Sequence, residues 1–222
     1  MFNLINRGKR IQFNCLLQIK SIEKSVKKQL ISDVPIGLLL SKGIDSNLIK
    51  EYGSFNKFYT VGSYGDEDLE YLSERNIENL TILEVDNKSF KDAFDKLLRL
   101  RGEPLSVPNE VMLYLIALKA RKDGVKVLLS GEGADEFFAG YDRIFNWAKT
   151  CTEFNVDTFI DLYSYIRPKK ESKIYNDIET IFNKCSLSEP FEKVRWFFIK
   201  YHMPVLFRRL DFSLMAAGVE GR

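Results

Sequence analysis

Short, largely apolar runs recur between residues 35 and 129 and are separated by longer amphipathic stretches. The runs lie at 35–40, 58–61, 80–85 and 125–129. Each has the length of a strand, and an apolar run bounded by polar residues is typical of a strand covered on both faces, as in a parallel sheet. The pattern therefore predicts at least four buried strands.

The stretches around these runs carry apolar residues at helical spacing. Ile22, Val26 and Leu30 repeat every four residues, and Pro35 limits the helix that they predict. Further helices are predicted at 47–52, 66–76, 90–101 and 109–122. Strands that alternate with helices need crossover connections, so the sequence predicts an α/β fold, a parallel sheet of about four to five strands flanked by helices.

The pattern changes after Tyr141. Aromatic and charged residues then mix at helical spacing, and no further strand is predicted. We expect a sheet part at about 34–140 and a mainly helical C-terminal region at about 141–222, together forming one domain at 21–222 after an N-terminal remnant or linker at 1–20. The aromatic residues are interpreted as core, because the positive stripe of a base-stacking surface is missing.

Composition excludes several classes of function. The 222 residues are 45% hydrophobic and 29% charged with a net charge of +2, which argues against nucleic acid or an anionic membrane as the main partner. Three widely spaced cysteines and a single histidine argue against a zinc site or a Ser-His-Asp triad. No segment resembles a signal peptide or a membrane span, so a cytoplasmic protein is expected.

The loop that follows the first predicted strand has unusual chemistry. It reads Ser41-Lys42-Gly43-Ile44-Asp45-Ser46. Small residues let a backbone close around phosphate oxygens, and the helix that follows supplies N–H groups. Asp45 would repel such an anion unless Mg²⁺ lies between them. The alternative is an ordinary strand-to-helix turn in which serine and aspartate cap the helix.

A second loop follows the strand at 125–129 and reads Ser130-Gly131-Glu132-Gly133-Ala134-Asp135-Glu136. Three acidic residues and two glycines suit a second Mg²⁺ ligand and an acidic group that faces a substrate amine. Capping by Asp135 is the alternative. Two such loops on one sheet favour a nucleotide site at the carboxyl ends of its strands.

Together these segments resemble the synthetase domain of glutamine-dependent asparagine synthetases, which are PP-loop ATP pyrophosphatases. Residues 34–46 resemble the family segment ending in S-G-G-x-D-S, and residues 128–141 resemble its second signature, the more specific of the two. Glu103-Pro104 resembles the family's E-P turn, and residues 211–222 resemble its D-x-x-S-M-A…V-E-x-R segment.

The resemblance implies ATP and Mg²⁺ as ligands and assigns roles by position. Aspartate would be adenylated on its side-chain carboxylate with release of pyrophosphate, and ammonia would then give asparagine and AMP. Glu132 would act near the reacting aspartate, and Asp45 and Asp135 would hold Mg²⁺. The residues expected to bind ATP are Leu39, Ser41, Gly43, Asp45, Ser46, Val61, Gly62, Ser130 and Gly131.

The chain departs from the family pattern in three places. Phe2 stands where the glutaminase domain has its cysteine nucleophile, Lys42 replaces the first PP-loop glycine, and the sequence stops at Arg222 before the family's later catalytic lysine. These departures predict a truncated or split gene product, or a domain completed by a separate C-terminal partner chain, that binds Mg-ATP yet turns over slowly or not at all. Ammonia would be supplied free or by a separate glutaminase chain. The Lys42 ammonium is expected either to contact a phosphate or to point to solvent.

Two other functions remain open at the level of sequence. The chain could act on another carboxylate, such as a sugar acid of a surface polysaccharide, because nothing in the acidic loop fixes the acceptor. It could also be a non-catalytic nucleotide-binding remnant that regulates a partner.

Overall fold

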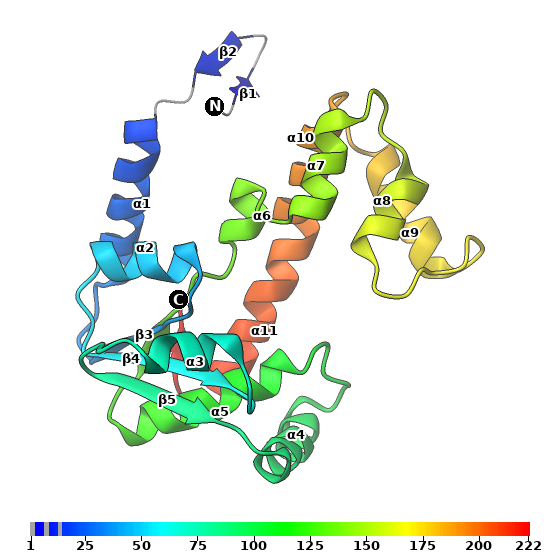
Figure 1. Ribbon diagram of the computed structural model, residues 1–222. Helices are drawn as coiled ribbons and strands as arrows, with labels where there is room; N and C mark the ends of the chain where they lie inside the picture. Colours follow the sequence, from blue (N-terminus) through cyan, green and yellow to red (C-terminus); the bar gives the residue numbers. More distant parts are fainter. Residues whose placement is uncertain (1–2, 7–8, 13–14) are drawn as a thin grey trace. The chain divides into compact units, whose positions relative to one another are not determined.

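The computed structural model describes residues 3–6, 9–12 and 15–222. The chain forms two compact units, which we call the sheet unit and the helical unit (Figure 1). The sheet unit comprises residues up to Gly131 together with Arg209–Arg222, and the helical unit comprises Glu132–Arg208. Phe2, on which the expectation about the missing cysteine nucleophile rests, lies outside the described residues.

The described part of the N-terminal segment contains two strands and the start of a helix. Strands β1 (Asn3–Asn6) and β2 (Lys9–Gln12) pair antiparallel, and α1 (Cys15–Gln29) follows. The helix predicted around Ile22 therefore starts earlier than its apolar repeat.

The sheet of the sheet unit is parallel throughout and has the order β5-β4-β3-β6-β7. Its strands are β3 (Ile36–Leu39), β4 (Lys57–Gly62), β5 (Leu80–Glu84), β6 (Val127–Leu129) and β7 (Glu220–Gly221). The predicted fold class is confirmed. The expectation of no strand after Tyr141 is wrong, because two residues without an apolar run carry no strand signal and β7 forms only by pairing with β6.

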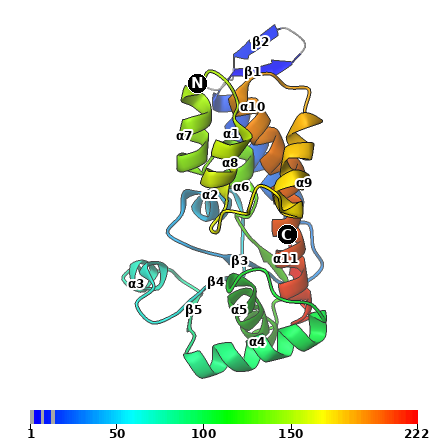
Figure 2. The same cartoon turned by 90° about the vertical axis from the view of Figure 1, so that its right-hand side faces the viewer.

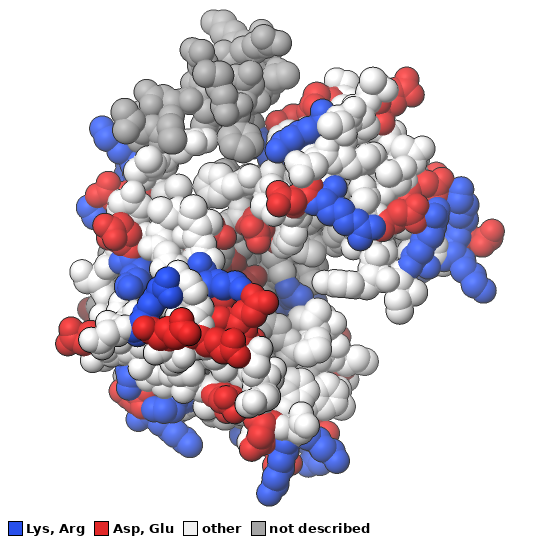
Figure 3. Space-filling view, viewed as in Figure 1, with Lys and Arg blue, Asp and Glu red and all other residues white. Residues whose placement is uncertain are grey.

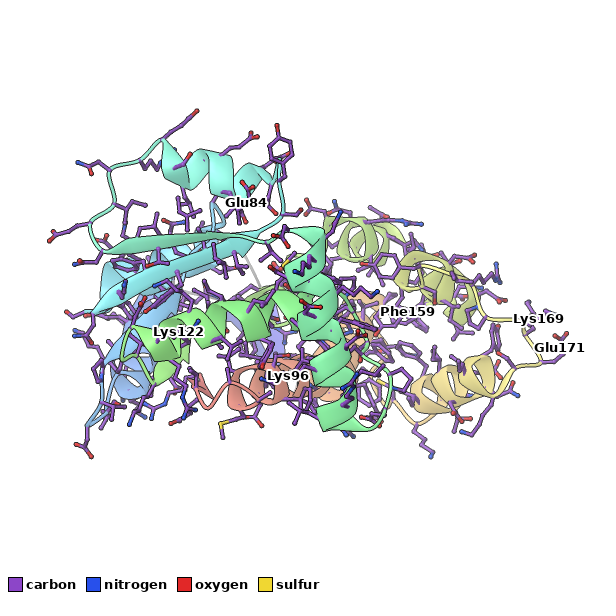
Figure 4. All side chains as sticks on the ribbon, turned by 90° about the horizontal axis from the view of Figure 1, so that it is seen from below. Glu84, Lys96, Lys122, Phe159, Lys169 and Glu171 are labelled. Atoms are coloured by element: carbon purple, nitrogen blue, oxygen red, sulfur yellow. The ribbon has the colours of Figure 1, made fainter. Side chains whose placement is uncertain are left out.

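The two faces of this sheet follow the two-residue period of a strand. Leu38, Val127 and Leu129 pack with residues from α2 (Ile44–Tyr52) and α3 (Glu67–Ser73). Tyr59 and Leu128 point to the opposite face and pack with residues from α4 (Asn87–Arg101) and α5 (Asn109–Lys122). Figure 2 shows α4 and α5 side by side, and Figure 4 shows from below how α5 runs along the sheet to Lys122. Helices thus cover both faces, as the apolar strands predict.

A buried carboxylate fixes the connection between α4 and α5. Glu110 is 0% exposed. It accepts hydrogen bonds from the backbone N–H groups of Ser106 (2.6 Å) and Val107 (3.3 Å) and from the Arg101 guanidinium. A buried charge is tolerated when it is paired and its oxygens are hydrogen-bonded, so this network holds the first turn of α5 against the end of α4.

The helical unit has its own aromatic core. Its helices are α6 (Ala134–Phe138), α7 (Asp142–Thr150), α8 (Val156–Tyr163), α9 (Lys173–Asn183), α10 (Pro190–Phe197), the π-helical turn η1 (Phe198–His202) and the first part of α11 (Met203–Met215). Phe159, labelled in Figure 4, is fully buried, and the rings of Phe182 and Phe197 contact it edge-on at 4.7 and 4.9 Å. The interpretation of the aromatic residues as core is confirmed.

The C-terminal segment belongs to the sheet unit from Arg209 onward. Leu210 and Leu214 of α11 are buried in the same core as Tyr59 and Leu128. The Arg222 guanidinium donates to the carbonyls of Gln29 (2.8 Å) and Ile31 (2.9 Å). The mainly helical C-terminal region is confirmed, and its last part, from Arg209, joins the sheet unit because Leu210 and Leu214 are buried in the core of that unit. Within the described residues, no helix is long and apolar enough to cross a membrane.

Candidate nucleotide site

The predicted ATP-binding residues gather at the carboxyl ends of three neighbouring strands. Leu39 ends β3, Val61 and Gly62 end β4, and Ser130 and Gly131 follow β6. These strands are adjacent in the order β4-β3-β6. The chain leaves β3 toward β4 on one side, whereas β6 lies on the other side, so the order reverses between β3 and β6. In open parallel sheets this reversal opens the crevice where ligands bind.

The loop after β3 is organised by the Ser46 hydroxyl. Ser46 is buried, and its Oγ accepts a hydrogen bond from the Ser41 backbone N–H at 3.1 Å. The same Oγ lies 3.1 Å from the Ser41 hydroxyl and 3.2 Å from the Gly43 carbonyl oxygen. The Gly43 N–H donates to the Ser41 Oγ at 3.1 Å. The two serines thus bind each other and fold the chain into a tight turn.

The start of α2 is available to an anion. Its N-cap residue Gly43 has no side chain and makes no side-chain cap hydrogen bond, and its backbone is extended with φ −67°. An uncapped helix start leaves N–H groups of the first turn directed outward, and the helix dipole favours negative charge there. The cap position itself is occupied by glycine and not by a serine or an aspartate of the loop.

The second loop approaches the first at Gly131. A Cβ atom at Gly131 would lie 3.0 Å from the Cβ of Asp45 and 3.3 Å from the backbone nitrogen of Ser46. Both neighbours belong to the first turn of α2. The absence of a side chain at Gly131 therefore lets the loop after β6 approach the loop after β3 at the point where the strand order reverses.

Leu39, Val61 and Gly62 have the environment of strand-end residues. Leu39 and Val61 are partly buried against the core that contains Tyr59 and Leu128. Gly62 is buried, and a Cβ there would lie 2.6 Å from Cγ of Asp66, the residue that caps α3. Their contact with adenosine stays a prediction.

Position 42 accepts lysine in place of the family's glycine because the backbone there does not have the positive φ that favours glycine. Among the described residues, the only non-glycine residues with positive φ are Asn79 and Ala139. The Lys42 ammonium forms an ion pair with Glu67, and its backbone N–H donates to Asp68 Oδ1 at 3.1 Å. The hydrogen bond to Glu67 is the main reason why the pKa of Lys42 is raised. Neither expectation for this side chain, phosphate or solvent, included a carboxylate partner.

The acidic residues after Gly131 belong to the helical unit. Glu136 is buried and accepts a hydrogen bond from the Tyr141 hydroxyl. Nε2 of His202 lies 3.7 Å from the Glu136 carboxylate, and Nδ1 of His202 is 2.7 Å from the Tyr163 hydroxyl. Three helical segments and the loop before α7 are thereby tied together. Sequence reasoning did not predict this network, because its members are spread from 136 to 202 and match no spacing rule.

Burial also affects the candidate metal ligand Asp135. Desolvation, followed by the neighbouring Glu136 charge, raises the pKa of Asp135. A raised pKa means that the ionised form of Asp135 is disfavoured, and a bound cation would offset this effect by favouring the ionised form. A cation at this carboxylate would therefore lower its pKa again.

No group of three or more His, Cys, Asp or Glu side chains within the described part of the chain could hold a metal. A magnesium ion bound with a nucleotide needs only one or two carboxylates, because phosphate oxygens and water complete its octahedron. Asp45, in the first turn of α2, fits that requirement. Asp45 belongs to the sheet unit and Asp135 to the helical unit, and their joint action stays a prediction.

Replacing Ser46 with alanine is expected to weaken pyrophosphate binding by about fivefold, because the Ser41 N–H loses its acceptor and a lost hydrogen bond costs about 1 kcal/mol. Titration calorimetry with magnesium pyrophosphate measures the change. Ser54→Ala, at an exposed serine beyond α2, is the matched control. Equal affinities in the two variants would contradict the role of Ser46.

Comparison with known proteins shows similarity to one protein family. The model of that family, described as asparagine synthase, matches residues 19–222. The chain is 29% identical over 187 residues to the glutamine-hydrolysing asparagine synthetase 2 of Oryza sativa subsp. japonica, covering 73% of this chain and 32% of that protein. It is 36% identical over 132 residues to the glutamine-hydrolysing asparagine synthetase 1 of Bacillus subtilis (strain 168), covering 55% and 21%. The chain thus spans a third or less of these relatives.

Proposed function

Because the chain belongs to the asparagine synthase family, we propose that it is the ATP-binding part of an amide-forming carbon–nitrogen ligase. ATP lies with its phosphates on the loop Ser41–Ser46 and its adenosine at the ends of β3 and β4. The acceptor is the side-chain carboxylate of aspartate, and the nitrogen donor is ammonia, supplied free or by a separate glutaminase chain. The relatives are named for glutamine hydrolysis.

The proposed reaction has two balanced steps. A carboxylate oxygen of aspartate forms a bond to the α-phosphorus of ATP, and the bond from that phosphorus to pyrophosphate breaks. Ammonia then adds to the acyl carbon, loses a proton, and expels AMP to leave the amide of asparagine. The first step builds negative charge on the departing pyrophosphate, so donors aimed at those oxygens lower its barrier.

The residues have separate tasks in this scheme. The first-turn N–H groups of α2 and the hydroxyls of Ser41 and Ser46 hold the pyrophosphate. Asp45 and Asp135 would hold Mg²⁺, which neutralises charge on the phosphates when bound. Glu132, half-buried at the start of the helical unit, would face the amine of the substrate or the incoming ammonia.

The observation that carries this proposal is the approach of Gly131 to Asp45 and Ser46. It brings the two loops with unusual chemistry together beside the uncapped start of α2. An ordinary strand-to-helix turn does not need two serines that bind each other across the loop. It also does not need a helix start without a side-chain cap next to the glycine of another loop. A site for pyrophosphate accounts for both.

Exchange of labelled pyrophosphate into ATP tests the first step. We expect exchange that requires both aspartate and Mg²⁺ and that disappears when EDTA is added. Parallel reactions with glutamate and with a sugar acid examine the acceptor. Exchange with one of these and none with aspartate would contradict the aspartate assignment, and failure of the protein to bind Mg-ATP would contradict the proposed function as a whole.

A further inference from the structure

The loop after β3 and the loop after β4 are joined through one residue, Lys42. Its ammonium pairs with Glu67, and its backbone N–H donates to Asp68 Oδ1 at 3.1 Å. Glu67 and Asp68 are in the first turn of α3, which Asp66 caps by accepting hydrogen bonds from Asp68 N–H at 2.9 Å and Leu69 N–H at 3.4 Å. Strands β3 and β4 are neighbours, so these loops meet at the same edge of the sheet.

Both donors of Lys42 are therefore held by anionic oxygens that come from the protein itself. A carboxylate and a phosphate offer similar oxygens to an ammonium or an N–H group, and each bond to a charged acceptor is stronger than a neutral one. Glu67 and Asp68 occupy the donors that an anion in this loop would use. The side chain of Glu67 is 82% exposed and that of Lys42 is 44% exposed, so a ligand from solvent can reach the pair.

The position of the Lys42–Glu67 ion pair determines whether it strengthens or weakens the binding of an anion. In the proposed function the Ser41–Ser46 loop binds an anion, and Lys42 is the one cationic residue of that loop. A carboxylate at Lys42 both cancels that charge and repels an incoming phosphate. The hydrogen bond from Lys42, followed by the Lys42 charge, lowers the pKa of Glu67.

We propose that Lys42 is an additional binding residue for the pyrophosphate part of the nucleotide, and that Glu67 and Asp68 hold its ammonium and N–H group in the free protein and are displaced when pyrophosphate binds. This inference rests on the proposed function, since it requires that the loop bind phosphate. Glu67 and Asp68 are positioning residues. They hold the loop in place in the free protein, and they weaken the binding of pyrophosphate because it must displace them.

Titration calorimetry on the whole chain with magnesium pyrophosphate tests the proposal. Glu67→Gln is expected to bind pyrophosphate about two- to fivefold more tightly than the unmodified chain, the range that an exposed ion pair spans. The gain should fall at high salt, because exposed charges are screened. Binding of AMP, which has no pyrophosphate, should not change.

Glu70→Gln is the matched control, because Glu70 is also exposed in the first turn of α3 and its replacement removes the same charge. A double-mutant cycle with Lys42→Met isolates the pair: Lys42→Met should weaken pyrophosphate binding, and Glu67→Gln should have a smaller effect in that background. A Glu67→Gln affinity equal to that of Glu70→Gln, or an unchanged effect without Lys42, would overturn the inference alone. If the unmodified chain binds neither pyrophosphate nor Mg-ATP, the proposed function fails as well.

Discussion

Gly131→Ala is expected to weaken the binding of ATP and pyrophosphate by about tenfold or more. The new Cβ would lie 3.0 Å from the Cβ of Asp45 and 3.3 Å from the Ser46 nitrogen. Neither neighbour is the flexible end of a side chain, so the first turn of α2 must shift. Overpacking of this kind costs about 1 to 3 kcal/mol. The shift would displace the first-turn N–H groups of α2, which are the proposed donors to the phosphates. Calorimetric titration with Mg-ATP gives the affinity, and circular dichroism checks that the variant is folded.

Gly43→Ala is the control for this prediction. Gly43 has φ −67°, which alanine adopts without strain, and a Cβ there would meet only the Ser41 hydroxyl at 3.1 Å. The hydroxyl can rotate away, but it then gives up its hydrogen bonds with the Ser46 Oγ and the Gly43 N–H. A lost hydrogen bond costs about 1 kcal/mol, so a change of about fivefold, smaller than that of Gly131→Ala, is expected. If Gly43→Ala weakens binding as much as Gly131→Ala does, the approach of the two loops is not what limits the site.

Glu110→Ala is expected to lower the free energy of unfolding by about 3 to 5 kcal/mol, the cost of breaking a buried ion pair by removing one partner. The substitution leaves the Arg101 guanidinium, whose side chain is only 12% exposed, without its buried carboxylate. It also takes away the acceptor of the Ser106 and Val107 N–H groups. Urea unfolding followed by far-ultraviolet circular dichroism measures the change.

Glu103→Ala provides the comparison, because Glu103 binds the same Arg101 guanidinium at 3.0 Å from an exposed position. An exposed ion pair contributes about 0 to 1 kcal/mol, so this variant should unfold at nearly the original urea concentration. Equal losses in the two variants would show that burial of Glu110 has no special effect on stability.

The surface on the face shown in Figure 3 carries basic and acidic side chains side by side. This mixture agrees with the near balance of 33 basic and 31 acidic residues in the sequence. Composition alone does not reveal which charges pair. The partner of Lys42 lies 25 positions away and meets it only because β3 and β4 are adjacent in the sheet.

Several features of the fold followed directly from sequence. Buried strands have continuous apolar character, and the runs at 35–40, 58–61, 80–85 and 125–129 therefore lie close to β3, β4, β5 and β6. Helix α5 was predicted with its observed limits, 109–122, because its apolar face and Gly124 define both ends. β7 was missed, because a two-residue strand has no period to detect.

The site was predictable only in part. The loops 41–46 and 130–136 were visible from small, acidic and hydroxyl residues after apolar runs, because such residues are an unusual way to end a strand. The division of the second loop between the sheet unit and the helical unit was not visible, since Ser130–Glu136 is continuous in sequence. The Glu136–Tyr141 hydrogen bond and the contact of Glu136 with His202 likewise depend on packing within the helical unit.

The sequence by itself determined the alternation of strands and helices and the chemical content of the two loops, because both depend on residues close together in the chain. The tertiary structure alone decided the strand order β5-β4-β3-β6-β7. That order sets the reversal between β3 and β6, brings Gly131 to Asp45 and Ser46, and gives Lys42 its carboxylate partners. Local periodicity contains no information about which strands become neighbours, since that choice depends on how the helices and side chains pack over the whole sheet.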